Sequence, residues 1–357
     1  MLNKILSFTK QLIAIPSTKE NPEELKKVLE VAEREIGEGF TVERFESNNT
    51  PSLLFYNSPK RPAKFKVILN AHLDVVPAKP EFYTPYEEGE KLYGRGADDM
   101  KAAAAVEILV FKELAKKLKY PIALQLVTDE EIGGNNGTKY QIEKGVRGDF
   151  AIAGEPTNFG VNNKAKGIVW GKINVTGVAA HGAYVWQGQN ALWTAKRILD
   201  RIEKTFPVLK KEEWKTTFNL AKIETSNQTF NKVPDDAVIS FDVRFIPEDE
   251  NTILKTLETL IATDGKLELI EKEPPHIADE NNLFVKNLRQ ATEKVTGKFG
   301  AVIVKHGASD LRHFSGAGVP GVTFGPIGAG LHTDAEWVDI RSLENYYKIL
   351  EQFLLSI

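Results

Sequence analysis

The stretch Gly94-Arg95-Gly96-Ala97-Asp98-Asp99-Met100-Lys101 decides how the rest of the chain is interpreted. Its glycines allow the backbone to turn and other segments to come close. Two adjacent acids follow, and a strongly helical run begins at Lys101. A carboxylate between a glycine-rich turn and a helix is well placed to hold a cation or a polar substrate. It could equally be an ordinary helix cap, so the neighbouring sequence has to decide.

The composition predicts a protein with a large core and no excess of positive charge. A length of 357 residues favours two domains, and 42% of the residues are hydrophobic. The formal net charge of -3 argues against nucleic acid or an anionic membrane as the main partner. The chain has no cysteine, which excludes disulfides, thiolate nucleophiles and Cys-ligated zinc. Histidines and carboxylates are therefore the candidate metal ligands.

The amino-terminal residues mix polar and apolar positions at helical spacing. They show neither a continuous apolar segment nor a small-residue cleavage site, so we expect no signal peptide. No stretch reaches the length of a membrane-spanning helix. The sequence predicts a soluble, cytoplasmic protein.

Apolar strands alternate with helices in the first half of the chain and predict a mainly parallel, mixed sheet flanked by helices. In such sheets, ligands gather beyond the carboxyl ends of the strands. We expect helices over 2–15, 21–36, 101–118 and 138–144, and strands over 41–45, 52–56, 65–71, 122–127 and 149–153.

Three of these predicted strands are followed at once by histidine or acidic residues. These residues are His72-Leu73-Asp74, Asp129-Glu130-Glu131 and Glu155. Surface acids placed by chance would not favour the strand ends in this way. The pattern therefore indicates a metal site at one edge of the sheet, close to the Asp99 loop.

The pattern changes near residue 167. Strands over 169–176, 218–225, 238–246 and 266–270 and helices over 189–206 and 250–263 follow the order βαββαβ. That order predicts a ferredoxin-like α+β domain inserted over 167–274. The catalytic domain would then comprise 1–166 and 275–357, closed by helices over 280–296, 310–314 and 342–357 and strands over 301–305 and 321–324.

The candidate ligands suit two divalent metals that share one carboxylate and one water. Zinc accepts both imidazole and carboxylate. We expect Asp99 to bridge two Zn²⁺ ions, which Co²⁺ could replace. His72 and Glu155 would hold one ion, and Glu131 and His332 the other.

Two further acids complete the predicted chemistry. Asp74 lies two residues beyond His72 on an extended segment, so it could orient the imidazole. Glu130 is the natural general base for the water. Each residue also has an ordinary interpretation: the histidines as satisfied polar groups, the Glu130-Glu131 pair as a solvated turn, and Asp74 as a strand-end cap.

Several motifs, in this order, resemble the two-zinc metallopeptidase and amidohydrolase family of succinyl-diaminopimelate desuccinylase, acetylornithine deacetylase and glutamate carboxypeptidase. The similarity spans nearly the whole chain. The motifs are Ala71-His72-Leu73-Asp74-Val75-Val76-Pro77, Gly94–Lys101, Asp129-Glu130-Glu131, Gly154-Glu155-Pro156-Thr157, Ala180-His181-Gly182-Ala183, Asn231-Lys232-Val233-Pro234, Asp242-Val243-Arg244, Gly307-Ala308-Ser309-Asp310 and His332 with Glu336.

The resemblance implies roles for the inserted domain as a lid and as the interface of a homodimer. It implies that His181 stabilises the tetrahedral oxyanion, often across the dimer. Arg244 would bind the substrate carboxylate, and Asn231 and Ser309 would be further substrate contacts.

Four departures from the family pattern weaken any single substrate name. After His332, the residues Thr333-Asp334-Ala335-Glu336 are closer to the general deacylase and carboxypeptidase pattern than to a strict desuccinylase ending. Asp98 stands where a small residue is commoner, Val185 stands where many relatives have proline, and residues 163–167 lack an arginine pair. We expect hydrolysis of the amide bond of an N-acyl amino acid, of the succinyl-diaminopimelate or acetylornithine type. Dipeptidase or carboxypeptidase activity is the alternative within the family, and a non-catalytic metal- or ligand-binding protein is the alternative of another class.

Overall fold

The computed structural model describes residues 1–357 and divides the chain into two compact units. The first unit comprises Met1–Lys164, His276–Val304 and Ser309–Ile357. The second unit comprises Ala165–Pro275 together with the short segment Lys305–Ala308. Each unit has its own hydrophobic core, so each is described by itself.

A nine-stranded mixed sheet forms the centre of the first unit. Its order is β1-β2-β6-β3-β7-β17-β8-β15, and β16 pairs with β8. The four inner strands β6, β3, β7 and β17 are parallel, whereas β1, β2 and β8 join antiparallel. The strands are β1 (Thr41–Ser47), β2 (Thr50–Tyr56), β3 (Val67–His72), β6 (Ile122–Val127), β7 (Ala151–Ala153), β8 (Val161–Ala165), β15 (His276–Ile277), β16 (Val302–Lys305) and β17 (Gly321–Thr323).

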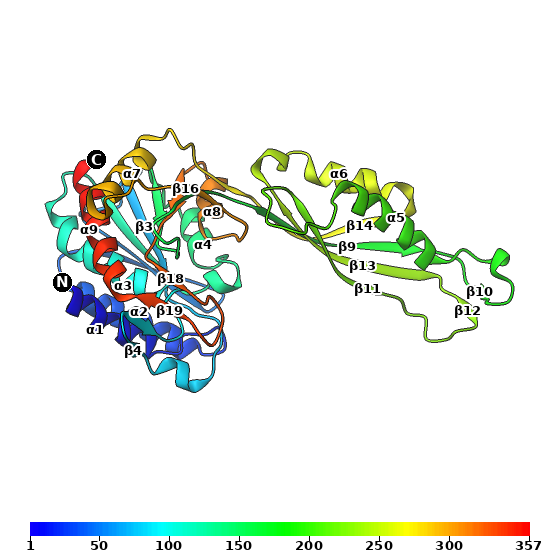
Figure 1. Ribbon diagram of the computed structural model, residues 1–357, viewed down its shortest axis with the longest axis horizontal. Helices are drawn as coiled ribbons and strands as arrows, with labels where there is room; N and C mark the ends of the chain where they lie inside the picture. Colours follow the sequence, from blue (N-terminus) through cyan, green and yellow to red (C-terminus); the bar gives the residue numbers. More distant parts are fainter. The chain divides into compact units, whose positions relative to one another are not determined.

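Helices cover both faces of this sheet, as Figure 1 shows. Alternate strand residues point to opposite faces, so Leu69 and Ile68 enter different cores. One core packs against α1 (Leu2–Ile13), α2 (Pro22–Ile36), α3 (Lys101–Leu114), α7 (Leu283–Thr296) and α9 (Ile340–Ser356); the other packs against α4 (Thr138–Glu143) and α8 (Leu311–Gly316). The predicted fold class is confirmed.

A small four-stranded sheet, β18-β19-β5-β4, was not predicted. Its strands are β4 (Tyr86–Glu88), β5 (Lys91–Tyr93), β18 (Gly328–Ala329) and β19 (Trp337–Asp339). Each has only two or three residues and none belongs to a continuous apolar run, so the sequence carries no strand signal for them. The pairing of Tyr93 with Trp337 brings the glycine-rich turn next to the chain around residue 336.

The second unit has the βαββαβ order. Its antiparallel sheet runs β11-β13-β9-β14, and α5 and α6 supply the helical side of one core. Strand β13 alternates buried and half-buried residues along its length, as expected for a sheet with helices on one face. The elements are β9 (Gly167–Thr176), α5 (Ala191–Thr205), β11 (Thr217–Glu224), β13 (Asp236–Phe245), α6 (Ile253–Ile261) and β14 (Lys266–Glu273).

A buried histidine links the first unit's stability to pH. His276 is fully buried in β15, and its Nε2 lies 2.8 Å from the carbonyl oxygen of Gly321. Burial lowers the pKa of His276 from 6.5 to about 4, so the folded protein keeps this ring neutral.

We predict that the wild type loses part of its stability as the pH falls from 6.5 towards 4. The unfolded chain binds a proton that the folded chain excludes, and the loss amounts to at most about 3 kcal/mol. His276→Gln can still donate to Gly321 but does not titrate. Urea unfolding in the presence of chelator measures the free energy of unfolding of the wild type and of His276→Gln. The difference between the two should become smaller as the pH falls, and a difference independent of pH would contradict the prediction.

Candidate metal centre

The three predicted ligand-bearing strand ends lie at one edge of the large sheet. Strand β3 ends at His72 and is parallel to both β6 and β7. The segment with Glu130 and Glu131 follows β6, and Glu155 follows β7. Parallel strands place their carboxyl ends together, so the local sequence order produces the cluster.

The Asp99 turn is held by the carboxylate of Glu336. Glu336 Oε1 accepts hydrogen bonds from the backbone N–H groups of Gly96, Asp98 and Asp99, at 2.9, 2.9 and 3.0 Å. Its Oε2 lies 2.5 Å from Arg95 Nη1, and both side chains are buried. Three amides and one guanidinium on a single carboxylate leave the turn little freedom.

This turn presents Asp99 between two histidines. Asp99 Oδ1 lies 3.0 Å from His72 Nε2, and Asp99 Oδ2 lies 3.3 Å from His332 Nε2. His72 Nε2 is also 3.8 Å from Glu155 Oε1, and His332 Nε2 is 3.1 Å from Glu131 Oε2. The five predicted ligands thus form two halves that share the two oxygens of Asp99.

The donor set fits divalent cations. Two groups of ligand atoms lie within 4.8 Å of one another: His72 with Glu130 and Glu155, and His72 with Asp99 and Glu131. Glu131 Oε1 is buried and has no hydrogen-bond partner within the chain. Imidazole nitrogens and carboxylate oxygens are ligands that zinc and related ions prefer. The metal-ligand roles themselves stay a prediction.

The pKa values of Asp99 and His332 show that the cluster strongly favours positive charge next to its carboxylates. Burial opposes ionisation of Asp99, but hydrogen bonds with His332 and His72 hold its pKa well below the usual range. Hydrogen bonds with Asp99 and Glu131 raise the pKa of His332 to about 10. Protons on the histidines therefore neutralise the acids in the chain alone, and a bound cation would replace them.

Glu130 lies in the group that contains His72 and Glu155. Burial, and then the negative charge of Glu155, raise the pKa of Glu130 well above its ordinary value. A carboxylate with a raised pKa is a stronger proton acceptor, as a general base requires. A nearby cation would oppose part of this shift.

Asp74 contacts both His72 and the Glu130 segment. His72 Nδ1 lies 3.1 Å from the backbone carbonyl oxygen of Asp74 and 3.6 Å from its Oδ1. The carboxylate instead accepts the N–H groups of Glu130 at 3.3 Å and Glu131 at 3.0 Å. The backbone of Asp74 orients the imidazole, and its side chain fixes the acidic segment.

The second unit holds His181, Asn231 and Arg244. Strand β10 (Ala180–His181) pairs with β12 (Lys232–Val233), and Gly182 N donates to Asn231 O at 2.6 Å. His181 Nδ1 accepts from Ala183 N at 3.1 Å, which leaves Nε2 as the donor of a neutral ring. Arg244 Nε binds Asp242 Oδ1 at 2.9 Å. Their substrate roles stay predictions.

Ser309 lies in the first unit and is buried. Its carbonyl oxygen accepts from Arg312 Nη1 at 2.8 Å, and its Oγ lies 3.4 Å from the N–H of Leu311. The sequence alone does not show whether Asp98 faces solvent. In the structure Asp98 is buried and does not face solvent.

Sequence reasoning missed the structural part played by Glu336. The residue was noticed only as part of a motif with His332. Its bonds to Arg95 and Asp99 join positions more than 230 residues apart, and only the small β18-β19-β5-β4 sheet brings them together. The only signal in the sequence was an acid four residues beyond a histidine that we predict to be a ligand.

Comparison with known proteins identifies the class. The model of peptidase family M20/M25/M40 matches residues 68–356, so the chain belongs to this family. It is an enzyme family whose members hydrolyse amide bonds, which confirms the resemblance found in the sequence. No helix is long and apolar enough to cross a membrane.

Solved structures share the fold over almost the full chain. A tripeptidase from Staphylococcus aureus is 21% identical, with a TM-score of 0.79 and coverage of 99% of this chain and 98% of that one. A family M20 metallo-carboxypeptidase from Sulfolobus solfataricus is 19% identical, with a TM-score of 0.75 and 98% coverage of both chains. A dinuclear metal-binding M20 peptidase from Bacillus subtilis is 14% identical, with a TM-score of 0.71 and coverage of 99% and 97%.

We predict that Glu336→Gln weakens metal binding about 10- to 100-fold, as loss of a group that orients ligands typically does. The amide keeps an acceptor for the turn but leaves the buried Arg95 guanidinium without its counter-charge. A titration of zinc against a chromophoric chelator measures the change.

Asp334→Asn is the matched control for this variant. Asp334 is a solvent-exposed acid two residues away that pairs with Lys79. Its substitution should leave zinc affinity unchanged. Equal zinc affinity in Glu336→Gln and the wild type would contradict the anchoring role.

Proposed function

We propose that the protein hydrolyses one amide bond of a short peptide or an N-acyl amino acid in a metal-dependent reaction. The observation that carries the proposal is Asp99, whose two oxygens each face a different histidine at 3.0 and 3.3 Å. Each histidine is in turn next to a different glutamate. This arrangement is suited to two cations that share one carboxylate.

The proposed metal ligands are His72 and Glu155 on one side, Glu131 and His332 on the other, and Asp99 between them. Two Zn²⁺ ions, or Co²⁺ in their place, would supply Lewis acidity and lower the pKa of a water towards neutrality. The chain supplies the proton chemistry: Glu130 accepts the water's proton and delivers it to the nitrogen of the leaving amine.

The second unit supplies the proposed substrate contacts. His181 Nε2 is a donor that can stabilise the negative charge on the former carbonyl oxygen. Asn231 lies on the chain segment next to His181 and would add a polar contact. Arg244 would bind the substrate carboxylate, and Ser309 would contribute from the first unit.

The substrate preference is open between peptides and acyl amino acids. The similar structures include a tripeptidase and a metallo-carboxypeptidase, which favours short peptides. The sequence motifs resemble acyl-amino-acid hydrolases of the desuccinylase and deacetylase type. We place short peptides first, because the similar structures named above are peptidases, and the assay below includes both substrate classes.

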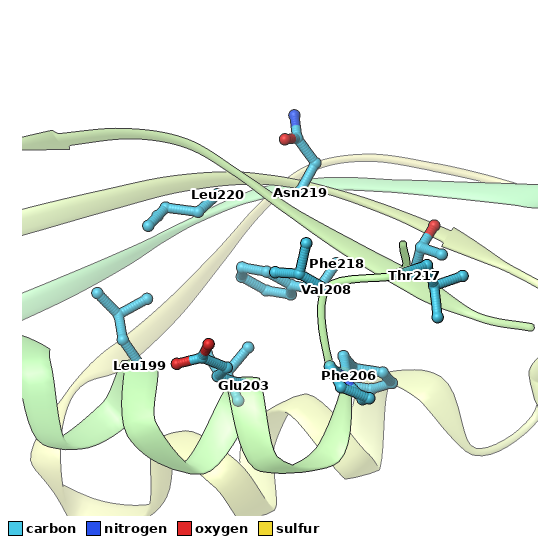
Figure 2. A pocket seen from close by; sticks show the side chains of 11 residues that line it. Leu199, Glu203, Phe206, Val208, Thr217, Phe218, Asn219 and Leu220 are labelled. Carbon is cyan, nitrogen blue, oxygen red and sulfur yellow. The ribbon is translucent and has the colours of Figure 1, made fainter. Parts of the chain in front are cut away.

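A homodimer through the second unit is part of the proposal. A groove of about 460 Å³ lies between α5 and the edge strand β11, and Figure 2 shows Val208 and Phe218 within it. Leu220 and Ile223 on β11 are 43% and 47% exposed. An unpaired edge strand with apolar side chains is a natural site for a second copy.

We predict that Glu130→Gln reduces turnover at least about 100-fold while two zinc ions still bind. Glu131→Gln, on the same turn, should instead lose zinc. The assay uses dipeptides, tripeptides, and N-acetyl and N-succinyl amino acids, each with and without chelator. Unchanged turnover of Glu130→Gln would remove the general base. Two bound metals without cleavage of any amide would favour a binding protein.

We predict that light scattering gives a mass of twice 39.8 kDa for the wild type. Leu220→Asp places a charge on the proposed interface and should shift the mass to that of one chain. Leu283→Asp, at an exposed position of the first unit, is the control and should stay dimeric. A monomeric wild type would exclude this interface.

A further inference from the structure

The segment that carries Glu130 and Glu131 is held by hydrogen bonds on two sides. On one side, the Asp74 carboxylate accepts both of their backbone N–H groups. On the other side, the carbonyl oxygen of Gly133 accepts two hydrogen bonds from side chains of α8. Arg312 Nη2 donates at 2.5 Å and His313 Nε2 at 3.0 Å. None of the proposed metal-binding or catalytic roles uses these two hydrogen bonds to the Gly133 carbonyl.

Helix α8 is a firm support for this contact. Leu311 and Phe314 are fully buried in the core on that face of the sheet. Arg312 and His313 are only 4% and 6% exposed. The guanidinium also donates to the carbonyl oxygen of Ser309, so it ties the start of α8 to Gly133.

The contact leaves no room for the segment to shift. A side chain on Gly134 would meet Asp310 Oδ1 at 2.0 Å, and the φ of +63° at Gly134 also favours glycine. Asp310 Oδ2 accepts from Thr138 Oγ1 at 2.5 Å, at the start of α4. Gly134 O itself accepts from the backbone N–H of Lys139 in α4 at 3.0 Å, so displacing the segment would break contacts with α8 and α4 together.

His313 keeps its donor at neutral pH. Burial, and then the positive charge of Arg312, lower the pKa of His313 to about 3. A neutral imidazole has a single N–H, and the carbonyl of Gly133 requires it on Nε2. Arg312 is permanently charged, so the pair offers two donors at neutral pH.

We propose that Arg312 and His313 are positioning residues, whose two hydrogen bonds to the Gly133 carbonyl set where the carboxylates of Glu130 and Glu131 lie. The proposal rests on the roles proposed above for these two acids. Residues 130–133 form one short turn, so a movement at Gly133 is transmitted to Glu130. A misplacement of about 1 Å at a reacting group can cost about 100-fold in rate.

The test compares His313→Leu with His313→Gln at saturating zinc. Leucine removes the donor, whereas the glutamine Nε2 can reach the same carbonyl. We expect kcat of His313→Leu to fall about 10- to 100-fold with little change in KM. We expect His313→Gln to recover most of the loss. Amide hydrogen exchange within residues 130–134 should be faster in the leucine variant and close to wild type in the glutamine variant.

His276→Leu is the matched control. His276 is also a buried, neutral histidine whose Nε2 faces a glycine carbonyl, that of Gly321, at 2.8 Å. This variant should lose stability while keeping kcat and the exchange of residues 130–134 unchanged.

Two results would overturn the positioning role. One is a kcat for His313→Leu that matches His276→Leu at equal stability, and the other is unchanged hydrogen exchange at residues 130–134. A wild type that cleaves no amide would count against the proposed function alone. The exchange comparison would still decide whether α8 holds the segment.

Discussion

One buried carboxylate, that of Glu336, holds the turn on which the metal centre depends. It accepts three backbone N–H groups of the glycine-rich turn and pairs with Arg95. A turn with two glycines would otherwise sample many conformations, and Asp99 would point in many directions. With the turn fixed, the two oxygens of Asp99 face His72 and His332. The division of the site into two halves follows from this single constraint.

The acids around Asp99 create a strong demand for positive charge. Glu131, Glu155 and Glu130 come within a few ångströms of the same two histidines. In the chain alone, hydrogen bonds to Asp99 and Glu131 raise the pKa of His332 to about 10. Proteins rarely gather so many carboxylates unless a cation or a proton balances them. The negative charge of the site therefore favours the binding of cations, and a pair of divalent ions can neutralise it.

The two units divide the proposed work. The first unit carries all five proposed ligands and the general base, and the Glu130–Glu131 segment is held there by Asp74 on one side and α8 on the other. The second unit carries His181 on β10, Asn231 in the turn just before β12, and Arg244 on β13. Proteins that share this fold at 14–21% identity can differ in substrate, because selectivity depends on side chains rather than on the fold.

The sequence by itself determined the fold class, the strand ends and the identity of the acidic and histidine cluster. Short apolar runs between helices marked β3, β6 and β7, and the residues just after them had to meet because parallel strands end at one edge. The anchor at Glu336, the grip of Arg312 and His313 on Gly133, and the small sheet of β4, β5, β18 and β19 were decided only by the tertiary structure. These contacts join segments about 180 to 240 residues apart, and the strands β5 and β19 that bring Glu336 to the turn have only three residues each. Local pattern cannot encode such a meeting, since its energy arises only when the whole core has packed.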